Sequence, residues 1–365
     1  IDDSEQDNLK KLCNEVFGEE NFVAQLVWQR AFAPKNDAKY ISNSHDYVLM
    51  LSKSIESFKI GRLKRTEEAN ARYSNPDNDP RGVWMSSDIS VKTYNEECDY
   101  PIITPSGRIV EPPTGRCWSL SKKAFLERLQ DNRIWFGPDG NGTPRIKRFL
   151  SELKFDGMAP TSIMFYKEVG HSQEGAQEVT KLLDAGAFDG PKPERLLERL
   201  LTLANLHRDA IILDFFSGSA TTAHAVMQLN AEDGGNRKFI MVQLPEPCEE
   251  GTEAAKAGYK NICEIGKERI RRAAKKIREE NPLACQNQDM GFKVFKLDTS
   301  NLLPWNPNAE TLAQDLYKAV NNVLADRSTD DLLYEILLKC NLPLTLPIEK
   351  KQFGGNTVYI VGMGA

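Results

Sequence analysis

The chain has 365 residues, of which 40% are hydrophobic and 27% are charged, with a net charge of −5 at pH 7. These values exclude a disordered or fibrous chain, and the length predicts two or three domains. No apolar run reaches the roughly 18 residues of a membrane span and no signal peptide is evident, so we expect a cytoplasmic protein with no membrane partner.

The first predicted elements are a helix and two strands. Ser4 is a typical N-cap, and the helical spacing of apolar residues after it stops at Gly18. Because the chain starts without methionine, one step before a helix cap, we expect it to be a piece of a longer protein. The β-rich runs Phe22–Trp28 and Tyr47–Leu51 then predict two strands joined by a long polar loop.

The segment from about residue 53 to 149 loses this regularity. It contains clusters of Pro, Gly, Asn and Asp, short strand-like pieces and one predicted helix, Lys122–Gln130. We therefore expect a separate, loop-rich insert.

Regular patterns return in the next part of the chain. Helices are predicted over Gln173–Asp184 and Pro193–Ala204, followed by a strand over Ala210–Phe215, a helix through Leu229 and a strand over Phe239–Leu244. The last three elements form a strand, helix, strand unit of the kind that builds a parallel sheet. The unbroken apolar runs predict strands that are buried on both faces.

The remaining sequence predicts mainly helices. One long helix is expected over about Glu253–Glu279, with its many Lys and Arg side chains forming a solvated face. Asn281–Met290 is interpreted as a linker, and Phe292–Ala365 as a small α+β unit with helices at Glu310–Leu324 and Thr329–Cys340.

The most informative segment is Ile211–Thr222. After the apolar strand, Asp214 and a turn of small residues lead into a helix, whose N-terminus offers free N–H groups and a positive dipole end to an anion. A dinucleotide site would require GxGxxG, whereas only Gly218 is a glycine here. An ordinary strand-to-helix turn remains the alternative for this segment taken alone.

Two further segments are expected to face the same cleft. Lys192 and Pro193 stand at a preformed helix start just before the strand. Gln243 ends the second strand, where its side chain can reach ribose hydroxyls.

In this order, these segments resemble the permuted β-class of amino methyltransferases, in which the cofactor half follows the catalytic half. Other stretches are similar to modification (Mod) subunits of type III restriction-modification systems. These stretches are residues 4–28, Pro34-Lys35-Asn36-Asp37, His45-Asp46-Tyr47-Val48-Leu49, Trp118 and Gly291-Phe292-Lys293-Val294-Phe295-Lys296-Leu297.

The resemblance implies a Rossmann-like α/β methyltransferase fold that binds S-adenosylmethionine. The side chains that it places around this cofactor are Lys192, Pro193, Asp214, Phe216, Gly218, Ser219, Thr221, Thr222 and Gln243. Two positions depart from the family. Ala220 stands where members usually have a second glycine, and Gln243, with Glu246 nearby, stands where many have an acidic ribose ligand.

The catalytic tetrapeptide of the family, Asp-Pro-Pro-Tyr, does not occur in residues 1–365. Glu111-Pro112-Pro113-Thr114 lacks the aromatic residue that stacks on the flipped base. We expect the tetrapeptide upstream of Ile1, so that the chain as given, with no catalytic residue of its own, binds better than it reacts.

The resemblance also implies a domain organisation. The expected parts are the end of the catalytic half (1–52), a target-recognition domain (53–155), the cofactor half (156–280) and a subunit-contact domain (291–365). In the recognition domain, phosphate or base contacts are expected from Lys59, Arg62, Lys64, Arg65 and Arg81, with Arg72, Tyr73, Trp84 and Trp118 nearby. For each residue singly, the alternative is that the aromatic rings fill a small core and the charges are solvated.

The resulting hypothesis is methyl transfer to N6 of adenine in duplex DNA, by a Mod homodimer that works with a restriction (Res) subunit. One alternative is a non-catalytic subunit for sequence-specific DNA binding and assembly, and a nicotinamide-dependent oxidoreductase is a third. No metal site is expected, because the seven cysteines are scattered and no CxxC pair occurs.

Overall fold

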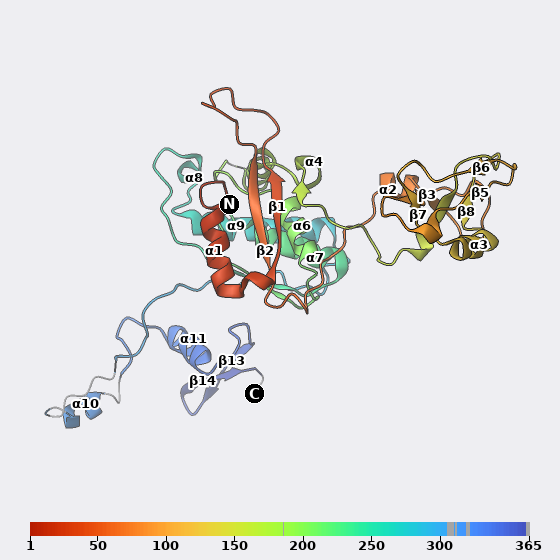
Figure 1. The fold of residues 1–365 in the computed structure, drawn as a ribbon. Coiled ribbons are helices and arrows are strands. Elements are labelled where there is room, and N and C mark those ends of the chain that lie inside the picture. Colours follow the sequence, from red (N-terminus) through yellow and green to blue (C-terminus); the bar gives the residue numbers. More distant parts are fainter. Residues whose placement is uncertain (185, 305–309, 311, 319–321, 363–365) are drawn as a thin grey trace. The chain divides into compact units, whose positions relative to one another are not determined.

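The computed structural model describes residues 1–184, 186–304, 310, 312–318 and 322–362. These residues form two compact units, 1–289 and 290–365 (Figure 1). None of the described helices is long and apolar enough to cross a membrane.

The first unit begins with a three-stranded sheet. Helix α1 (Gln6–Phe17) and the 3-10 turn η1 (Glu19–Asn21) precede β1 (Phe22–Gln29), which pairs antiparallel with β2 (His45–Leu51) and parallel with β10 (Ile163–Met164). The predicted strands and the helix end at Gly18 are confirmed, although Glu5 rather than Ser4 is the N-cap. Trp28 anchors the sheet, because its fully buried indole donates to Gly170 O at 2.9 Å.

The insert between β2 and β10 has its own core. Its helix α3 has the predicted bounds, Lys122–Gln130, and Trp118 and Phe125 are among the buried residues. The other elements are α2 (Glu67–Ala71), β3 (Trp84–Asp88), β4 (Ser90–Val91), η2 (Glu96–Cys98), β5 (Ile102–Ile103), β6 (Ile109–Val110), β7 (Cys117–Trp118), β8 (Ile134–Trp135), β9 (Arg145–Phe149) and η3 (Leu150–Glu152). Trp84 is also buried, so both tryptophans fill the interior and neither is presented to a ligand.

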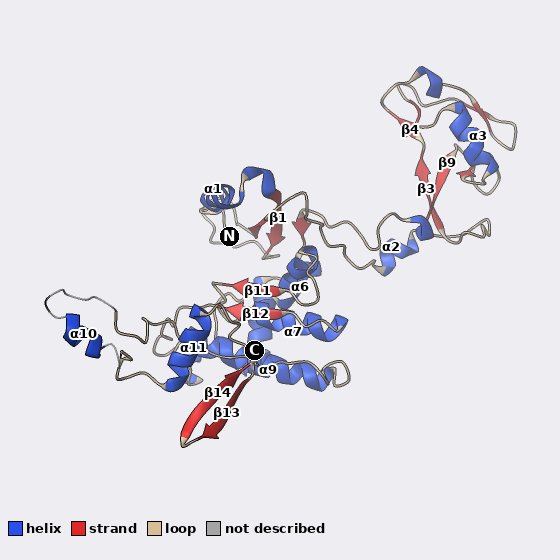
Figure 2. Ribbon diagram, turned by 90° about the horizontal axis from the view of Figure 1, so that it is seen from below, coloured by secondary structure: helices blue, strands red, loops and turns tan. Residues whose placement is uncertain are grey.

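The second half of this unit contains the predicted parallel pair. Strands β11 (Ile211–Asp214) and β12 (Lys238–Met241) are joined through α7 (Thr221–Asp233), which packs on one face of the pair, as Figure 2 shows. Helices α4 (Tyr166–Val169), α5 (Ser172–Leu183) and α6 (Glu194–Leu203) precede them.

The prediction that β11 and β12 are buried on both faces is wrong. Ile212 and Phe239 pack against Leu201 and Val226 on the helix side. The alternate side chains face outward, and those of Ile211, Leu213 and Ile240 are 50 to 65% exposed. In this structure the apolar run is therefore a strand whose helix side is packed and whose other side is largely exposed.

The long helix predicted over Glu253–Glu279 is two helices. Residues Glu253–Lys256 form α8 and Ile262–Glu280 form α9. Gly258, with φ of +89°, turns the chain out of the helical conformation, and the Asn261 side chain caps α9 by accepting from Glu264 N.

The second unit contains both helices and strands. It contains α10 (Leu312–Lys318), α11 (Thr329–Lys339) and the hairpin of β13 (Ile348–Phe353) with β14 (Asn356–Val361). Ser328 and Asp331 form a capping box at the start of α11. The predicted helix Glu310–Leu324 lies partly outside the described residues.

Candidate cofactor site

The turn after β11 is held in an unusual conformation. Ala220 precedes α7 with φ of +61° and ψ of +37°, so the position that the sequence suggested for a glycine does require a left-handed residue. Gly218 has φ of +50°, and a Cβ atom there would lie 3.0 Å from Cζ of Phe188. No side chain caps α7, so its first backbone N–H groups donate to no capping side chain and face the turn.

Three segments meet at this turn. The Gly218 N–H donates to Oε1 of Gln243, beyond the end of β12, at 2.8 Å. The Thr221 hydroxyl donates to Lys192 O at 3.2 Å, just before α6. The predicted segments therefore share one edge of the β11–β12 pair.

The predicted site residues fall into two groups. Phe216 is 80% exposed, and Asp214, Gly218 and Lys192 are also accessible. By contrast, the side chains of Ser219, Thr221 and Thr222 are buried and bonded within the protein; Thr222, for example, donates to Asp214 Oδ2 at 2.6 Å. These three hydroxyls shape the turn and are not exposed to a ligand. Pro193 is the N-cap residue of α6 and is buried.

Arg269 on α9 was missed by the sequence analysis, which placed it on a solvated face. Its side chain has no exposed surface, and Nη1 donates to Ser219 Oγ at 2.9 Å and to Thr221 Oγ1 at 2.7 Å. The helical spacing gave a usable signal, because Arg269 lies four residues before the fully buried Ala273.

A buried acid and histidine lie behind the turn. Glu194, the first residue of α6, places Oε1 3.2 Å from Nε2 of His224 on α7, and its backbone N–H donates to Glu178. Burial raises the pKa of Glu194 to about 7, and burial together with the positive charge of Arg269 lowers the pKa of His224 to about 3. Both groups are therefore mainly neutral in a slightly acidic solution.

Gly175 allows α5 to lie against the segment before α6. A Cβ atom on Gly175 would lie 2.3 Å from Pro191 O and 2.9 Å from Pro193 N, both of them backbone atoms. We expect Gly175→Ala to displace Lys192 and Pro193 and to lower the free energy of unfolding by about 1–3 kcal/mol, measured by urea denaturation. Gly186→Ala is the matched control, because its Cβ would meet only Oγ1 of Thr180 at 3.8 Å. Equal stability of the two variants would contradict this packing.

The family of the chain follows from comparison with known proteins. A model of the DNA methylase family matches residues 1–276. The chain belongs to the DNA methylase family. The mixed α/β architecture of the chain, with α7 connecting two parallel strands, fits the Rossmann-like fold of methyltransferases.

Several curated proteins are similar to this chain. The Type III restriction-modification enzyme StyLTI Mod subunit of Salmonella typhimurium is 36% identical over 82% of the chain and 45% of its own length. The EcoP15I Mod subunit of Escherichia coli is 29% identical over 99% of the chain and 58% of its own length. The Type II methyltransferase M.KpnI of Klebsiella pneumoniae is 30% identical over 73% of the chain and 66% of its own length. The chain thus spans about half the length of the Mod subunits that it matches.

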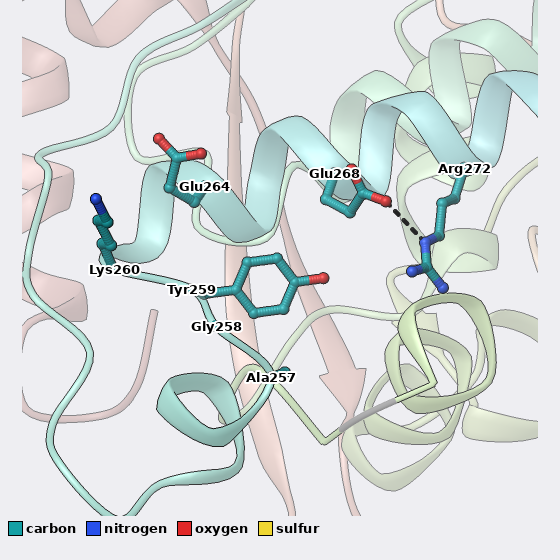
Figure 3. A pocket seen from close by; sticks show the side chains of 7 residues that line it. All are labelled: Ala257, Gly258, Tyr259, Lys260, Glu264, Glu268 and Arg272. Carbon is teal, nitrogen blue, oxygen red and sulfur yellow. Dashed lines mark hydrogen bonds and ion pairs between the residues drawn. The ribbon is translucent and has the colours of Figure 1, made fainter.

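A cavity of about 480 Å³ lies elsewhere in the first unit, along the start of α9 (Figure 3). It is lined by Tyr259, Lys260 and Arg272, among others, and by none of the predicted cofactor residues. Arg272 pairs with Glu268 at 2.9 Å and with Asp184 at 2.6 Å, so charges in this cavity neutralise one another. We place no ligand in it.

Most of the basic residues predicted to contact DNA are accessible. Lys59 is exposed, the Lys64 side chain is 97% exposed, and Arg65 lies over the ring of Tyr73. Arg62 lies 4.2 Å from the ring centroid of Phe155, a half-exposed residue that the sequence analysis did not select. These residues lie near the two points where the insert joins the sheet-containing part of the unit.

Arg81, the fifth basic residue predicted to contact DNA, is held by partners inside the insert. Its guanidinium donates through Nε and Nη2 to the carboxylate of Asp79, pairs with Asp131 at 3.1 Å and lies 4.5 Å from the ring of Phe149. Because these internal partners occupy its donors, Arg81 stabilises the insert.

The cysteines and acidic residues give no metal site within the described part of the chain. No group of three or more His, Cys, Asp or Glu side chains there has the arrangement that a metal ion requires. All seven cysteines are free thiols, and Cys98, Cys117 and Cys285 are buried.

Proposed function

We propose that this chain is part of a type III Mod subunit that transfers a methyl group from S-adenosylmethionine to N6 of adenine in duplex DNA. The observation that carries the proposal is the meeting of Lys192, the turn after Asp214 and Gln243 at one edge of parallel strands, in a chain of the DNA methylase family. The similarity to Mod subunits supports the type III assignment.

The residues at the turn suit the charged end of this cofactor. Asp214 ends β11 with Oδ2 accepting from Thr222, and its remaining lone pairs can accept from the ammonium group of the methionine part. The uncapped start of α7 favours a carboxylate through its N–H groups and its dipole. When bound, the cofactor supplies an electrophilic methyl group on its sulfonium.

The other accessible residues suit the nucleoside end. Phe216 offers an exposed ring for stacking, and Nε2 of Gln243 can donate to a ribose hydroxyl while its Oε1 holds Gly218 in place. Lys192 stays near the site, because its ammonium group pairs with Asp46 at 3.0 Å and lies 4.7 Å from the ring centroid of Trp28.

The rest of the organisation follows the same resemblance and is part of the proposal. Residues 53–155 form the recognition domain, which is inserted between the catalytic half and the cofactor half. The order of the two halves is permuted, because the catalytic half comes first in the chain. Lys59, Arg62, Lys64 and Arg65 contact the phosphates or bases of duplex DNA. The unit that starts at Met290 contacts a second Mod copy or a Res subunit.

The second candidate is a non-catalytic role in sequence-specific DNA binding and assembly. Methylation assays with the parent protein separate the two functions. N6-methyladenine as the product supports the enzyme, binding without methylation supports the second candidate, and methylation of cytosine alone would end the adenine assignment.

Calorimetric titration with S-adenosylmethionine tests the site directly. We expect Asp214→Asn to weaken binding at least tenfold, about 1.4 kcal/mol, because a neutral amide loses the charge-assisted hydrogen bond to the ammonium. Asp209→Asn is the matched control, since Asp209 is exposed just before β11, at the other end of the strand. No heat with the unchanged chain, or heat with a nicotinamide dinucleotide instead, would refute the cofactor assignment.

A further inference from the structure

The connection between β1 and β2 extends well beyond the sheet. The last paired residues are Gln29 and His45, and Figure 1 shows the intervening chain leaving the ends of the two strands as a long loop. The Lys35 N–H donates to Ser42 Oγ at 2.8 Å, which closes the loop and leaves residues 36–41 as its tip. Ala38 N donates to Lys35 O and adds a turn within the tip.

The tip presents two large apolar side chains to solvent. Tyr40 is 84% exposed and Ile41 is 88% exposed, and they are adjacent in the chain. Single exposed apolar residues are common on protein surfaces. An adjacent aromatic and aliphatic pair at the end of a projecting loop is instead typical of side chains that insert between the base pairs of a duplex, as a wedge.

The charges beside this pair favour a polyanion. Lys35 and Lys39 are both exposed, and Nζ of Lys39 lies 5.1 Å from the ring centroid of Tyr40. The one acidic residue in the tip is Asp37. An apolar centre with ammonium groups next to it matches the stacked bases and flanking phosphates of a nucleic acid.

The base of the loop is tied to the candidate cofactor site. Asp46, next to the last ladder pair, forms an ion pair with Arg30 (Nε–Oδ1 2.9 Å) and accepts a hydrogen bond from Lys192 Nζ at 3.0 Å. The carbonyl of Lys192 in turn accepts from Thr221 in the cofactor turn. The loop therefore rises from the part of the unit where the methyl group would be delivered.

We propose that Tyr40 and Ile41 enter the DNA duplex and fill the space that the target adenine leaves when it is turned out of the stack. Lys35 and Lys39 contact the phosphates on either side. This inference rests on the proposed function and deepens it, because it names the residues that keep the duplex open. Turning out a base loses its stacking with both neighbours, and an inserted ring and side chain replace those contacts.

The experiment uses the full chain with S-adenosylmethionine and a duplex selected by this chain from a random-sequence pool. Each adenine of the selected site is replaced in turn by 2-aminopurine, whose fluorescence rises when it leaves the stack. We expect one position to brighten with the unchanged chain. The double variant Tyr40→Ala/Ile41→Ala should lose most of this rise and bind the duplex at least tenfold more weakly, while its cofactor affinity stays unchanged.

Two controls make the result specific. Leu12→Ala/Val16→Ala removes two exposed apolar side chains from α1, and it should leave the fluorescence rise intact. Tyr40→Phe/Ile41→Leu keeps a ring and an aliphatic chain, and it should retain most of the rise. Thermal melts of all variants should agree, since the tip side chains are exposed.

The outcomes separate the two proposals. If the unchanged chain does not bind S-adenosylmethionine, the proposed function is refuted. Normal cofactor binding with no brightening at any position, or an alanine double variant that brightens and binds like the unchanged chain, would refute the wedge. The wedge is also refuted if the alanine variant binds the duplex normally but loses binding to phosphatidylserine vesicles, because the tip would then be a lipid contact.

Discussion

Replacing Arg269 by methionine is expected to lower the free energy of unfolding by about 3–5 kcal/mol, the usual cost of removing one partner from a buried charged network. Methionine fills a similar volume but leaves Ser219, Thr221 and the nearby Glu178 carboxylate without the guanidinium. The turn after β11 would lose its support from α9, so the affinity for S-adenosylmethionine should fall as well. Urea denaturation and calorimetric titration measure the two effects.

The control for this prediction lies one turn further along α9. Arg272 is 36% exposed and pairs with Glu268 and Asp184 at the surface, so Arg272→Met should cost less than about 1 kcal/mol. Arg269→Lys should be intermediate, because a lysine keeps the charge but lacks the planar fork of donors. Similar stabilities for the Met variants at 269 and 272 would show that the buried network does not support the turn.

Glu194→Gln and His224→Gln are expected to tilt the pH dependence of stability in opposite directions. The pKa of Glu194 is raised to about 7, so the folded chain holds a proton that the unfolded chain has released above pH 4.5, and stability falls as the pH rises through this window. The pKa of His224 is lowered to about 3, so the unfolded chain binds the extra proton below pH 6.5, and stability rises with pH.

These two slopes nearly cancel between pH 5 and 8, and each variant removes one of them. Relative to the unchanged chain, the free energy of unfolding of Glu194→Gln should rise by about 2 kcal/mol from pH 5 to 8, and that of His224→Gln should fall by a similar amount. Urea denaturation at several pH values measures the slopes. A variant that is merely less stable shifts its plot of unfolding free energy against pH without changing the slope. Plots parallel to that of the unchanged chain would therefore contradict the shifted pKa values of Glu194 and His224.

Local patterns were sufficient to predict much of the fold. The bounds of α3 follow from Ser121, which accepts from Ala124 N as an N-cap, and the parallel pairing of β11 with β12 follows from the helix between them. The wrong predictions concern which faces of a strand or helix are buried by other parts of the chain. An apolar run such as Ile211–Asp214 has the same sequence pattern whether one face or both are packed, because burial depends on segments far away in the chain.

The candidate site was predictable as segments but not as individual side chains. The order of the three segments was sufficient to place Lys192, Asp214 and Gln243 near one another. The inward direction of Arg269 was signalled by its helical spacing from Ala273, but its bond to Thr221 depends on how α9 packs against α7, which no local pattern contains. Arg81 has one local partner, Asp79, two residues away, and a second partner, Asp131, 50 residues away, which only the fold reveals.

The left-handed alanine in the turn has a consequence for how this region can change by mutation. The Ala220 methyl group is buried, and a Cβ atom on Gly266 of α9 would lie 3.5 Å from it. Glycine at position 220 would relieve about 1 kcal/mol of backbone strain but leave two glycines facing each other across a small void. Alanine at position 266 would refill that void from a helix, where alanine is favoured over glycine. The two sites are therefore coupled, and an exchange of their residues moves one methyl group across the contact while the packed volume stays the same.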